Sequence, residues 1–287
     1  MQTLSPTNAW QRPTIGPPNS PIETMPDRAP DASDERPERP KSEFDATDRS
    51  QRDICVILPA GGSGRRFASS DNKVFAALAG IPLWIHTARR LCRSSQVCQL
   101  IVAASPTDQP TFRQHLERWP LPRPVEIVDG GRERFDSVRN AIAAVDTGTA
   151  NWIAIHDAAR PLVPTSDIAS VFRAARETGA AILASPLAGS IKRDIGQDCR
   201  NVDRRDLWMA LTPQVFKLDW IREAYQRHRG FPVTDDAAMV EAMGRPVQLV
   251  QGSPANLKIT YPDDLAVAEA LMRAQTHDAP NSSGATH

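Results

Sequence analysis

The stretch CVILPAGGSGRRFASSDNKVF, Cys55 to Phe75, decides the fold. An apolar run ends at Pro59, a turn of small residues follows, and two arginines and a lysine come after it. A continuous apolar run of this kind is typical of a parallel strand that is buried on both faces. Ligands of open parallel sheets bind beyond the carboxyl ends of the strands, so we expect a binding site directly after Pro59.

The chain that follows repeats this pattern. Apolar runs of strand length alternate with segments of helical periodicity as far as residue 186. The alternation predicts an α/β fold: a Rossmann-like, mostly parallel sheet with helices on both faces. In one helix, Ser166 is the candidate N-cap and Gly179 the candidate C-cap. Between residues 186 and 210 the helical period is lost around a glycine turn, and we expect a protruding β-arm there.

The two ends of the chain differ in composition from the middle. Residues 1–50 are rich in proline, serine and charged side chains, and residues 276–287 are similar. Such segments bury too little apolar surface to offset the entropy lost on ordering. We therefore expect a disordered N-terminal extension (1–50), one folded domain (52–275, with the arm at about 186–210) and a disordered tail (276–287).

Charge and cysteine content exclude several classes of protein. Lys and Arg number 34, as do Asp and Glu, and this balance argues against nonspecific nucleic-acid binding. The 4 cysteines form no CxxC pair, which is typical of a reducing compartment. The sequence has no apolar run of about 18 residues and no signal peptide at its start. We expect a cytoplasmic protein without a nucleic-acid or membrane partner.

The opening stretch matches neither of the two common phosphate-binding loops. The P-loop pattern fails because Arg66 stands at the position of its second glycine, and the dinucleotide pattern fails because Phe67 stands at its third. What remains is a small-residue turn, whose N–H groups can bind an anion, followed by Arg65, Arg66 and Lys73. A plain turn with solvated arginines stays the alternative for this stretch alone.

Four more polar stretches follow predicted strands or belong to the arm. They are VDGGRERFDSV (Val128–Val138), IHDAARP (Ile155–Pro161), NVDRRDLWMALTPQ (Asn201–Gln214) and ANLKIT (Ala255–Thr260). Each also has a structural interpretation, such as a strand-end cap for Asp157 or a solvated loop for Lys258. Together they place polar groups where the ligand crevice of the sheet is expected.

The ordered set of motifs resembles the 2-C-methyl-D-erythritol 4-phosphate cytidylyltransferases of non-mevalonate isoprenoid biosynthesis. The matching pieces are PAGGSGRR, Lys73, VDGGRERFDSV, HDAARP, VDRRDLWMALTPQ, TDDAA and NLKIT, between residue 52 and about residue 270. The resemblance implies transfer of CMP from CTP to methylerythritol phosphate, giving CDP-methylerythritol and pyrophosphate, with Mg²⁺ or another divalent cation. It also implies a homodimer in which each arm, about Pro186–Asp206, completes the partner's site.

The same resemblance assigns roles to individual residues. The catalytic residues that it implies are Arg66, Lys73, Lys258 and Arg204. The nucleotide-binding positions are Ala60, Gly61, Gly62, Gly131 and Ser137, and the positions that contact the acceptor are Asp157, Arg160, Ser190 and Thr212. It leaves the metal ligands unknown. Where the family usually has Pro-Lys-Gln, this chain has Asn72-Lys73-Val74, so we expect a looser loop before the lysine.

Elementary chemistry is consistent with this reaction and leaves alternatives open. A phosphate monoester has a second pKa near 6, so it is a ready nucleophile that needs no activating side chain. Catalysis then consists mainly of bringing two polyanions together and stabilising charge. A ribitol 5-phosphate cytidylyltransferase or a sugar 1-phosphate nucleotidyltransferase would use the same glycine turns, whereas the arm favours methylerythritol phosphate. A nucleotide-binding regulatory module without turnover is disfavoured, because Arg66, Lys73 and Lys258 are all present.

Overall fold

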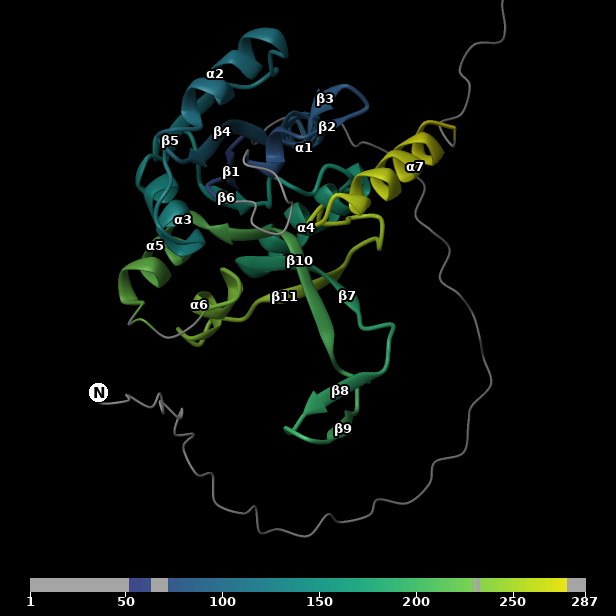
Figure 1. Cartoon of the computed structure of the whole chain (residues 1–287). Coiled ribbons are helices and arrows are strands. Elements are labelled where there is room, and N and C mark those ends of the chain that lie inside the picture. Colours follow the sequence, from purple (N-terminus) through teal and green to yellow (C-terminus); the bar gives the residue numbers. More distant parts are fainter. Residues whose placement is uncertain (1–51, 63–71, 229, 231–232, 278–287) are drawn as a thin grey trace, which may run out of the picture. The chain divides into compact units, whose positions relative to one another are not determined.

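The computed structural model describes residues 52–62, 72–228, 230 and 233–277 (Figure 1). The expected N-terminal extension lies outside the described residues, as do Arg65, Arg66 and residues 278–287 of the expected tail. No helix in the described part of the chain is long and apolar enough to cross a membrane.

A seven-stranded sheet organises the described residues, in the order β11-β7-β10-β6-β1-β4-β5. Its strands are β1 (Ile54–Pro59), β4 (Val97–Ala104), β5 (Val125–Asp129), β6 (Trp152–Ile155), β7 (Ala180–Pro186), β10 (Trp208–Lys217) and β11 (Gln248–Gln251). β1 pairs in parallel with β4 and β6, β4 with β5, and β7 with β11. Only β10 among these strands runs antiparallel to its neighbours, β6 and β7. The predicted mostly parallel sheet is confirmed.

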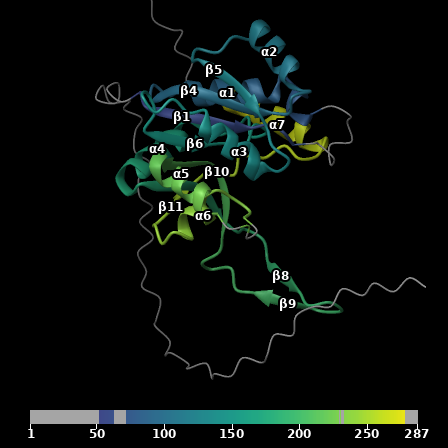
Figure 2. The same ribbon diagram turned by 90° about the vertical axis from the view of Figure 1, so that its left-hand side faces the viewer.

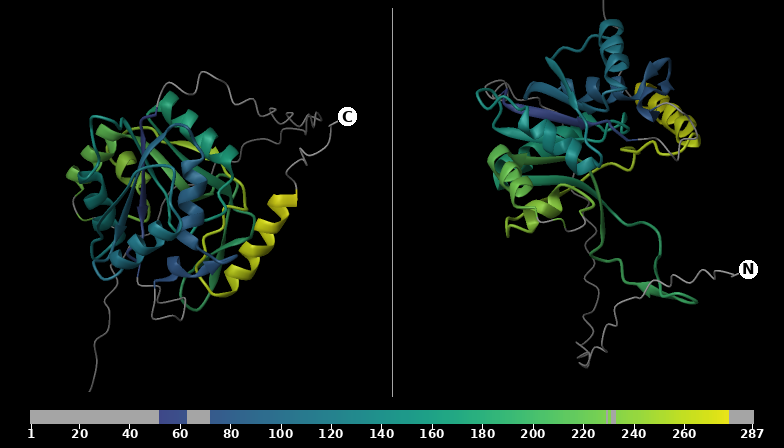
Figure 3. Two further views of the ribbon diagram at one scale, coloured as in Figure 1. Left: turned by 90° about the horizontal axis from the view of Figure 1, so that it is seen from above. Right: turned by 60° about the vertical axis from the view of Figure 1, so that its left-hand side comes forward.

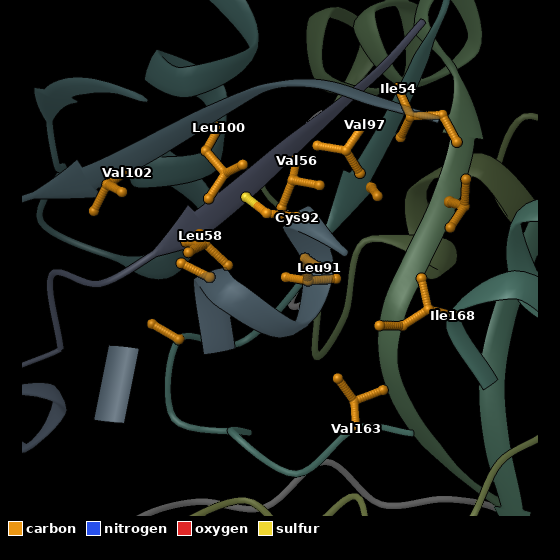
Figure 4. Close-up of a cluster of buried hydrophobic side chains, with 14 of the residues drawn as sticks. Ile54, Val56, Leu58, Leu91, Cys92, Val97, Leu100, Val102, Val163 and Ile168 are labelled. Carbon is orange, nitrogen blue, oxygen red and sulfur yellow. The ribbon is translucent and has the colours of Figure 1, made fainter. Parts of the chain in front are cut away.

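Helices cover both faces of this sheet. They are α1 (Leu83–Cys92), α2 (Gln109–Arg118), α3 (Arg134–Ala143), α4 (Thr165–Thr178), α5 (Leu218–Arg227), α6 (Ala237–Glu241) and α7 (Asp263–His277), with a 3₁₀ helix, η3 (Lys73–Phe75). Successive side chains of a strand point to opposite faces. Accordingly, Val56 and Leu58 of β1 pack in a core with α1, α2 and α4, whereas Cys55 and Ile57 pack in a second core with α3, α5 and α6. Figure 4 shows the first core, including Leu91 of α1.

The ends of α4 test the two predicted caps. Gly179 has φ 94° and donates its N–H to the carbonyl of Ala175, which confirms it as the C-cap. The prediction for Ser166 was wrong, because α4 begins at Thr165 and its N-cap is Pro164. With φ −64° and ψ 146°, Pro164 is extended, and the helix starts directly after it, which places Ser166 within the first turn.

Two short hairpins lie outside the large sheet. One pairs β2 (Ala77–Leu78) with β3 (Ile81–Pro82), and α7 packs beside it (Figure 3). The other pairs β8 (Ile191–Asp194) with β9 (Cys199–Val202) and turns at Gly196, which has φ 103° (Figure 2). This second hairpin is the predicted β-arm, and β10 continues from it into the sheet.

Candidate active site

A pocket of about 370 Å³ lies at the carboxyl ends of β1, β5 and β6. The structure brings all the predicted nucleotide-binding positions into its wall, namely Ala60, Gly61, Gly62, Gly131 and Ser137. Of the other predicted site residues, Lys73, Asp157 and Lys258 also line it. Because these residues come from η3, the ends of three strands, the start of α3 and the segment after β11, the fold gathers them from distant parts of the sequence.

Asp157 is the electrostatic centre of the pocket. Its carboxylate lies 2.9 Å from Nζ of Lys258, 3.2 Å from Nε of Arg160 and 3.8 Å from Nε of Arg134. Burial raises the pKa of Asp157, but the charges of Lys258, Arg134 and Arg160 outweigh this effect and hold the pKa well below its ordinary value. One carboxylate therefore faces three cations, and the surplus of positive charge suits a polyanionic ligand.

Lys73 contacts the segment of chain that carries Lys258. Nζ of Lys73 donates to the carbonyl oxygen of Ile259 at 3.0 Å, and Ile259 directly follows Lys258. The backbone N–H of Ile259 in turn donates to the carbonyl of Ala159, beyond the end of β6. These contacts hold η3, the end of β6 and the segment after β11 against one another, with both ammonium groups at the pocket.

The turn between β5 and α3 is shaped by glycine and serine. A Cβ atom at Gly131 would lie 2.0 Å from Cβ of Asp136, which leaves no room for any side chain. The buried hydroxyl of Ser137 accepts the N–H of Gly131 at 3.0 Å and donates to the carbonyl of Glu133 at 3.1 Å. The turn is thereby fixed with its backbone along the pocket wall, at the N-terminus of α3, where the helix dipole favours anions.

Arg134 is a pocket residue that the sequence analysis missed. Its guanidinium makes two hydrogen bonds, of 3.0 and 2.7 Å, to Asp236, whose side chain is only 1% exposed. Asp236 also accepts the hydroxyl of Tyr225 at 2.6 Å, and its backbone N–H donates to Oε1 of Gln214 at 3.0 Å. The TDDAA motif was a signal that could have found this pair, because Asp236 lies within it.

Thr212 lies in a buried hydrogen-bond chain behind the pocket. Nε2 of His156 is 3.2 Å from the carbonyl of Arg160, which can only accept, so Nε2 carries the proton. Burial lowers the pKa of His156 to about 4, so the ring is neutral and Nδ1 is an acceptor. The Thr212 hydroxyl, 3.0 Å away, donates to Nδ1 and accepts the N–H of Asp157 at 3.2 Å. These hydrogen bonds orient the residues that follow β6.

Comparison with known proteins connects this geometry to a family. A family model described as 2-C-methyl-D-erythritol 4-phosphate cytidylyltransferase matches residues 54–274. The chain belongs to this family. The 2-C-methyl-D-erythritol 4-phosphate cytidylyltransferase of Rhodopirellula baltica is 47% identical over 229 residues, which cover 76% of this chain and 94% of that protein. The same enzyme of Bacillus velezensis is 39% identical over 229 residues, covering 78% and 97%.

Solved structures of the family have the same fold. The 2-C-methyl-D-erythritol 4-phosphate cytidylyltransferase of Thermus thermophilus superimposes with a TM-score of 0.63 at 32% identity, covering 77% of this chain and 99% of that one. A 4-diphosphocytidyl-2C-methyl-D-erythritol synthase from Anaerococcus prevotii gives a TM-score of 0.68 at 24% identity, covering 77% and 98%, and supports the fold alone.

Four residues that the cytidylyltransferase resemblance assigns lie away from the pocket wall. Arg160 and Thr212 stand behind it, in contacts with Asp157. Ser190 is exposed just before β8, and Arg204 is exposed after β9. The guanidinium of Arg204 binds the carbonyls of Leu187, Ala188 and Gly189, so it ties together the two sides of the arm's base.

The family chemistry implies a divalent cation, and the donors in the pocket fit one. Among the described residues, no group of three or more His, Cys, Asp or Glu side chains is placed to hold a metal ion. Mg²⁺ in nucleotide sites needs fewer protein ligands, since it is usually bound by one or two carboxylates together with substrate phosphates and water. The pocket wall offers the carboxylates of Glu133 and Asp157.

Proposed function

We propose that this chain transfers CMP from CTP to 2-C-methyl-D-erythritol 4-phosphate, releasing pyrophosphate and forming CDP-methylerythritol. The observation that carries the proposal is the convergence of Lys73, Lys258 and Arg134 on one pocket at the carboxyl edge of the sheet. Membership of the cytidylyltransferase family, over residues 54–274, supports the same reaction. The function is enzymatic, in non-mevalonate isoprenoid biosynthesis.

The nucleotide lies along the two glycine turns. Ala60, Gly61 and Gly62 follow β1, and the turn fixed by Gly131 and Ser137 lies beside them, since a Cβ atom at Gly61 would be 3.5 Å from the Ser137 hydroxyl. Glycine and other small residues at these two turns leave their backbone accessible, so a flat base can approach closely. The triphosphate then extends toward Lys73 and Lys258. Arg66, which lies outside the described residues, is proposed as a third catalytic cation.

In the reaction, a phosphate oxygen of methylerythritol phosphate attacks the α-phosphorus of CTP. A P–O bond forms there, the bond to the β-phosphate breaks, and pyrophosphate leaves with the electron pair. Lys258, held 2.9 Å from Asp157, and Lys73 bind the phosphate oxygens and offset the charge that accumulates. Mg²⁺, or another divalent cation, would supply further charge neutralisation when bound, with Asp157 or Glu133 as the protein ligand.

The acceptor is bound at Asp157, with Arg160 and Thr212 behind it in contact with that residue, and by the arm of a second subunit, through Ser190 and Arg204. Exposed apolar side chains lie on the arm and at its base: Ile195 (44% exposed), Leu207 (38%), Trp208 (37%) and Met209 (51%). Such a surface fits an interface between two copies of the chain in the homodimer. A cytoplasmic location is part of the same proposal.

The direct test measures pyrophosphate release from Mg²⁺ and CTP with three acceptors in parallel. Methylerythritol phosphate should support release, whereas ribitol 5-phosphate and a sugar 1-phosphate should give little. Release with another acceptor alone would retain the nucleotide site and refute the assigned acceptor. Protein that binds CTP and is silent with all three acceptors would instead be a nucleotide-binding module without turnover.

The two pocket lysines give a second test. Lys73→Ala and Lys258→Ala should each lower kcat by about 100-fold, the scale of losing one preorganised charge donor. Lys217→Ala is the matched control, since Lys217 is exposed at the end of β10, opposite Trp152 at the start of β6, and lies outside the pocket wall. A fall of less than about threefold in both pocket variants, at full CTP saturation, would refute the proposed roles.

A further inference from the structure

The side chain of Asn72 uses all its polar atoms to tie three segments together. Nδ2 donates to the carbonyl of Ala60 at 2.6 Å and to Oδ2 of Asp108 at 3.0 Å, while Oδ1 accepts the backbone N–H of Val74 at 3.3 Å. Asn72 is only 8% exposed, so these bonds form where water competes poorly. Asn72, directly before Lys73, is therefore tied by hydrogen bonds, whereas the rest of the loop for which a looser structure was expected, residues 63–71, lies outside the described residues.

Two of the three partners of Asn72, Ala60 and Val74, line the pocket, and the third, Asp108, belongs to α2's start. Ala60 follows β1 and lines the pocket, and its own N–H donates to the carbonyl of Ala103 in β4 at 2.8 Å. Asp108 is the N-cap residue directly before α2. Val74 follows Lys73 within η3. Asn72 thus joins the first glycine turn, α2 and the backbone that carries Lys73.

Packing at the end of η3 supports the same anchoring. Phe75 meets Phe112 of α2 edge to face, with ring centroids 4.8 Å apart, and its N–H donates to the carbonyl of Asn72 at 2.9 Å. The end of η3 is thus held to α2 by the ring contact, and its start by the Asn72 amide. Lys73, between Asn72 and Val74, extends from this anchored turn to the carbonyl of Ile259.

We propose that Asn72 is a positioning residue that sets where Lys73 meets the phosphates of the nucleotide. The proposal rests on the function proposed above. Removing the amide leaves the Ala60 carbonyl and the Asp108 carboxylate without this donor and frees the N–H of Val74. η3 then loses its link to the end of β1, and Lys73 samples positions away from the reacting phosphate.

The test combines turnover with a double-mutant cycle. Asn72→Ala should lower kcat by about tenfold or more, the scale of a small misplacement of a catalytic group, and should change the CTP KM less. In a Lys73→Ala background the same change should cost less than twofold, because a residue that acts through Lys73 has nothing left to position. Asn72→Asp, which has nearly the same shape and keeps the acceptor for Val74, serves as a second variant in the same cycle.

Asn151→Ala is the matched control. Asn151 is an exposed asparagine that donates to Asp53 at 3.1 Å, before β1 and β6 begin and therefore at the opposite edge of the sheet. It should leave kcat unchanged. An equal loss from Asn72→Ala with and without Lys73, or no loss in either Asn72 variant, would overturn the proposal.

Hydrogen–deuterium exchange separates a failure of this inference from a failure of the proposed function. In Asn72→Ala, amides within residues 72–78 should exchange at least about threefold faster than in the unmodified chain, and Asn151→Ala should leave them unchanged. If the unmodified protein shows no turnover, the proposed function fails while exchange still tests the anchoring. Unchanged exchange in Asn72→Ala would refute the role of Asn72 whatever the activity.

Discussion

At the scale of single residues, the site is organised by carboxylates that hold cations in place. Asp157 contacts Lys258, Arg160 and Arg134, and Asp236 holds Arg134 from the other side. The sequence indicated Asp157, because it stands in the polar turn at the end of an apolar strand. It did not indicate the pair of Arg134 and Asp236, because these residues are 102 positions apart and meet only in the folded chain.

The Arg134–Asp236 pair predicts a large and partner-dependent effect on stability. Arg134→Ala leaves the buried Asp236 carboxylate without its cation and should lower the free energy of unfolding by about 3 kcal/mol. Adding Asp236→Asn should recover part of this loss, since a neutral amide needs no counter-charge. Urea unfolding of the single and double variants measures both effects.

The control for this pair is Arg139→Ala. Arg139 pairs with Asp136 at 3.1 Å on the surface, where its side chain is 55% exposed, so the variant should cost less than about 1 kcal/mol. Equal losses for Arg134→Ala and Arg139→Ala would contradict a structural role for the buried pair.

The burial of His156 should make the stability of the protein depend on pH. Burial lowers its pKa from 6.5 to about 4 in the folded protein, so the unfolded chain binds the proton first as the pH falls. The free energy of unfolding should therefore decrease from pH 7 to pH 4, by up to about 3 kcal/mol from this residue. In His156→Gln, whose amide can still donate to the Arg160 carbonyl, the decrease should be correspondingly shallower.

Unfolding curves at pH 7, 5.5 and 4.5 measure this difference. His86 and His115, whose pKa values burial also lowers, are present in both proteins and contribute equally. If the free energy of unfolding varied with pH equally in the unmodified protein and in His156→Gln, His156 would not be buried in its neutral form.

At the scale of elements, local sequence patterns predicted where strands and the arm lie but not how the strands pair. Apolar runs marked the strands, and the glycine turn between β8 and β9 marked the arm. Each of these signals is contained within a few consecutive residues. The antiparallel entry of β10 between β6 and β7 depends on where the chain returns after the arm, which no local pattern encodes. Ser166 misled as a cap because Pro164, two residues earlier, sets the start of α4.

The turn between β5 and α3 gives a prediction at this scale. Gly131→Ala would place Cβ against the backbone and Cβ of Asp136, so it should lower the free energy of unfolding by about 1–3 kcal/mol and weaken CTP binding. Calorimetric titration with CTP and thermal unfolding measure the two effects. Gly189→Ala on the arm, where an added Cβ meets nothing within 4 Å, should leave stability unchanged. Unchanged CTP affinity and stability in Gly131→Ala would contradict the tight turn.

At the scale of the whole molecule, the parallel strands bring the ends of β1, β5 and β6 to one edge of the sheet. The expectation of a polar site at this edge is confirmed by the pocket, because strand direction alone determines which residues meet there. The arm residues could not be placed in the pocket from the sequence, and in the single chain Ser190 and Arg204 lie outside its wall. Their proposed role therefore depends on a second copy of the chain.

The most direct measurement of the central claim is ³¹P NMR of a reaction containing the full chain, Mg²⁺, CTP and methylerythritol phosphate. The proposed transfer predicts loss of the CTP and phosphate monoester signals, with pyrophosphate and the coupled pair of a diphosphate diester appearing in equal amounts. Pyrophosphate accompanied by CMP, with the monoester unchanged, would mean hydrolysis in place of transfer. An unchanged spectrum from folded protein would contradict the proposed reaction altogether.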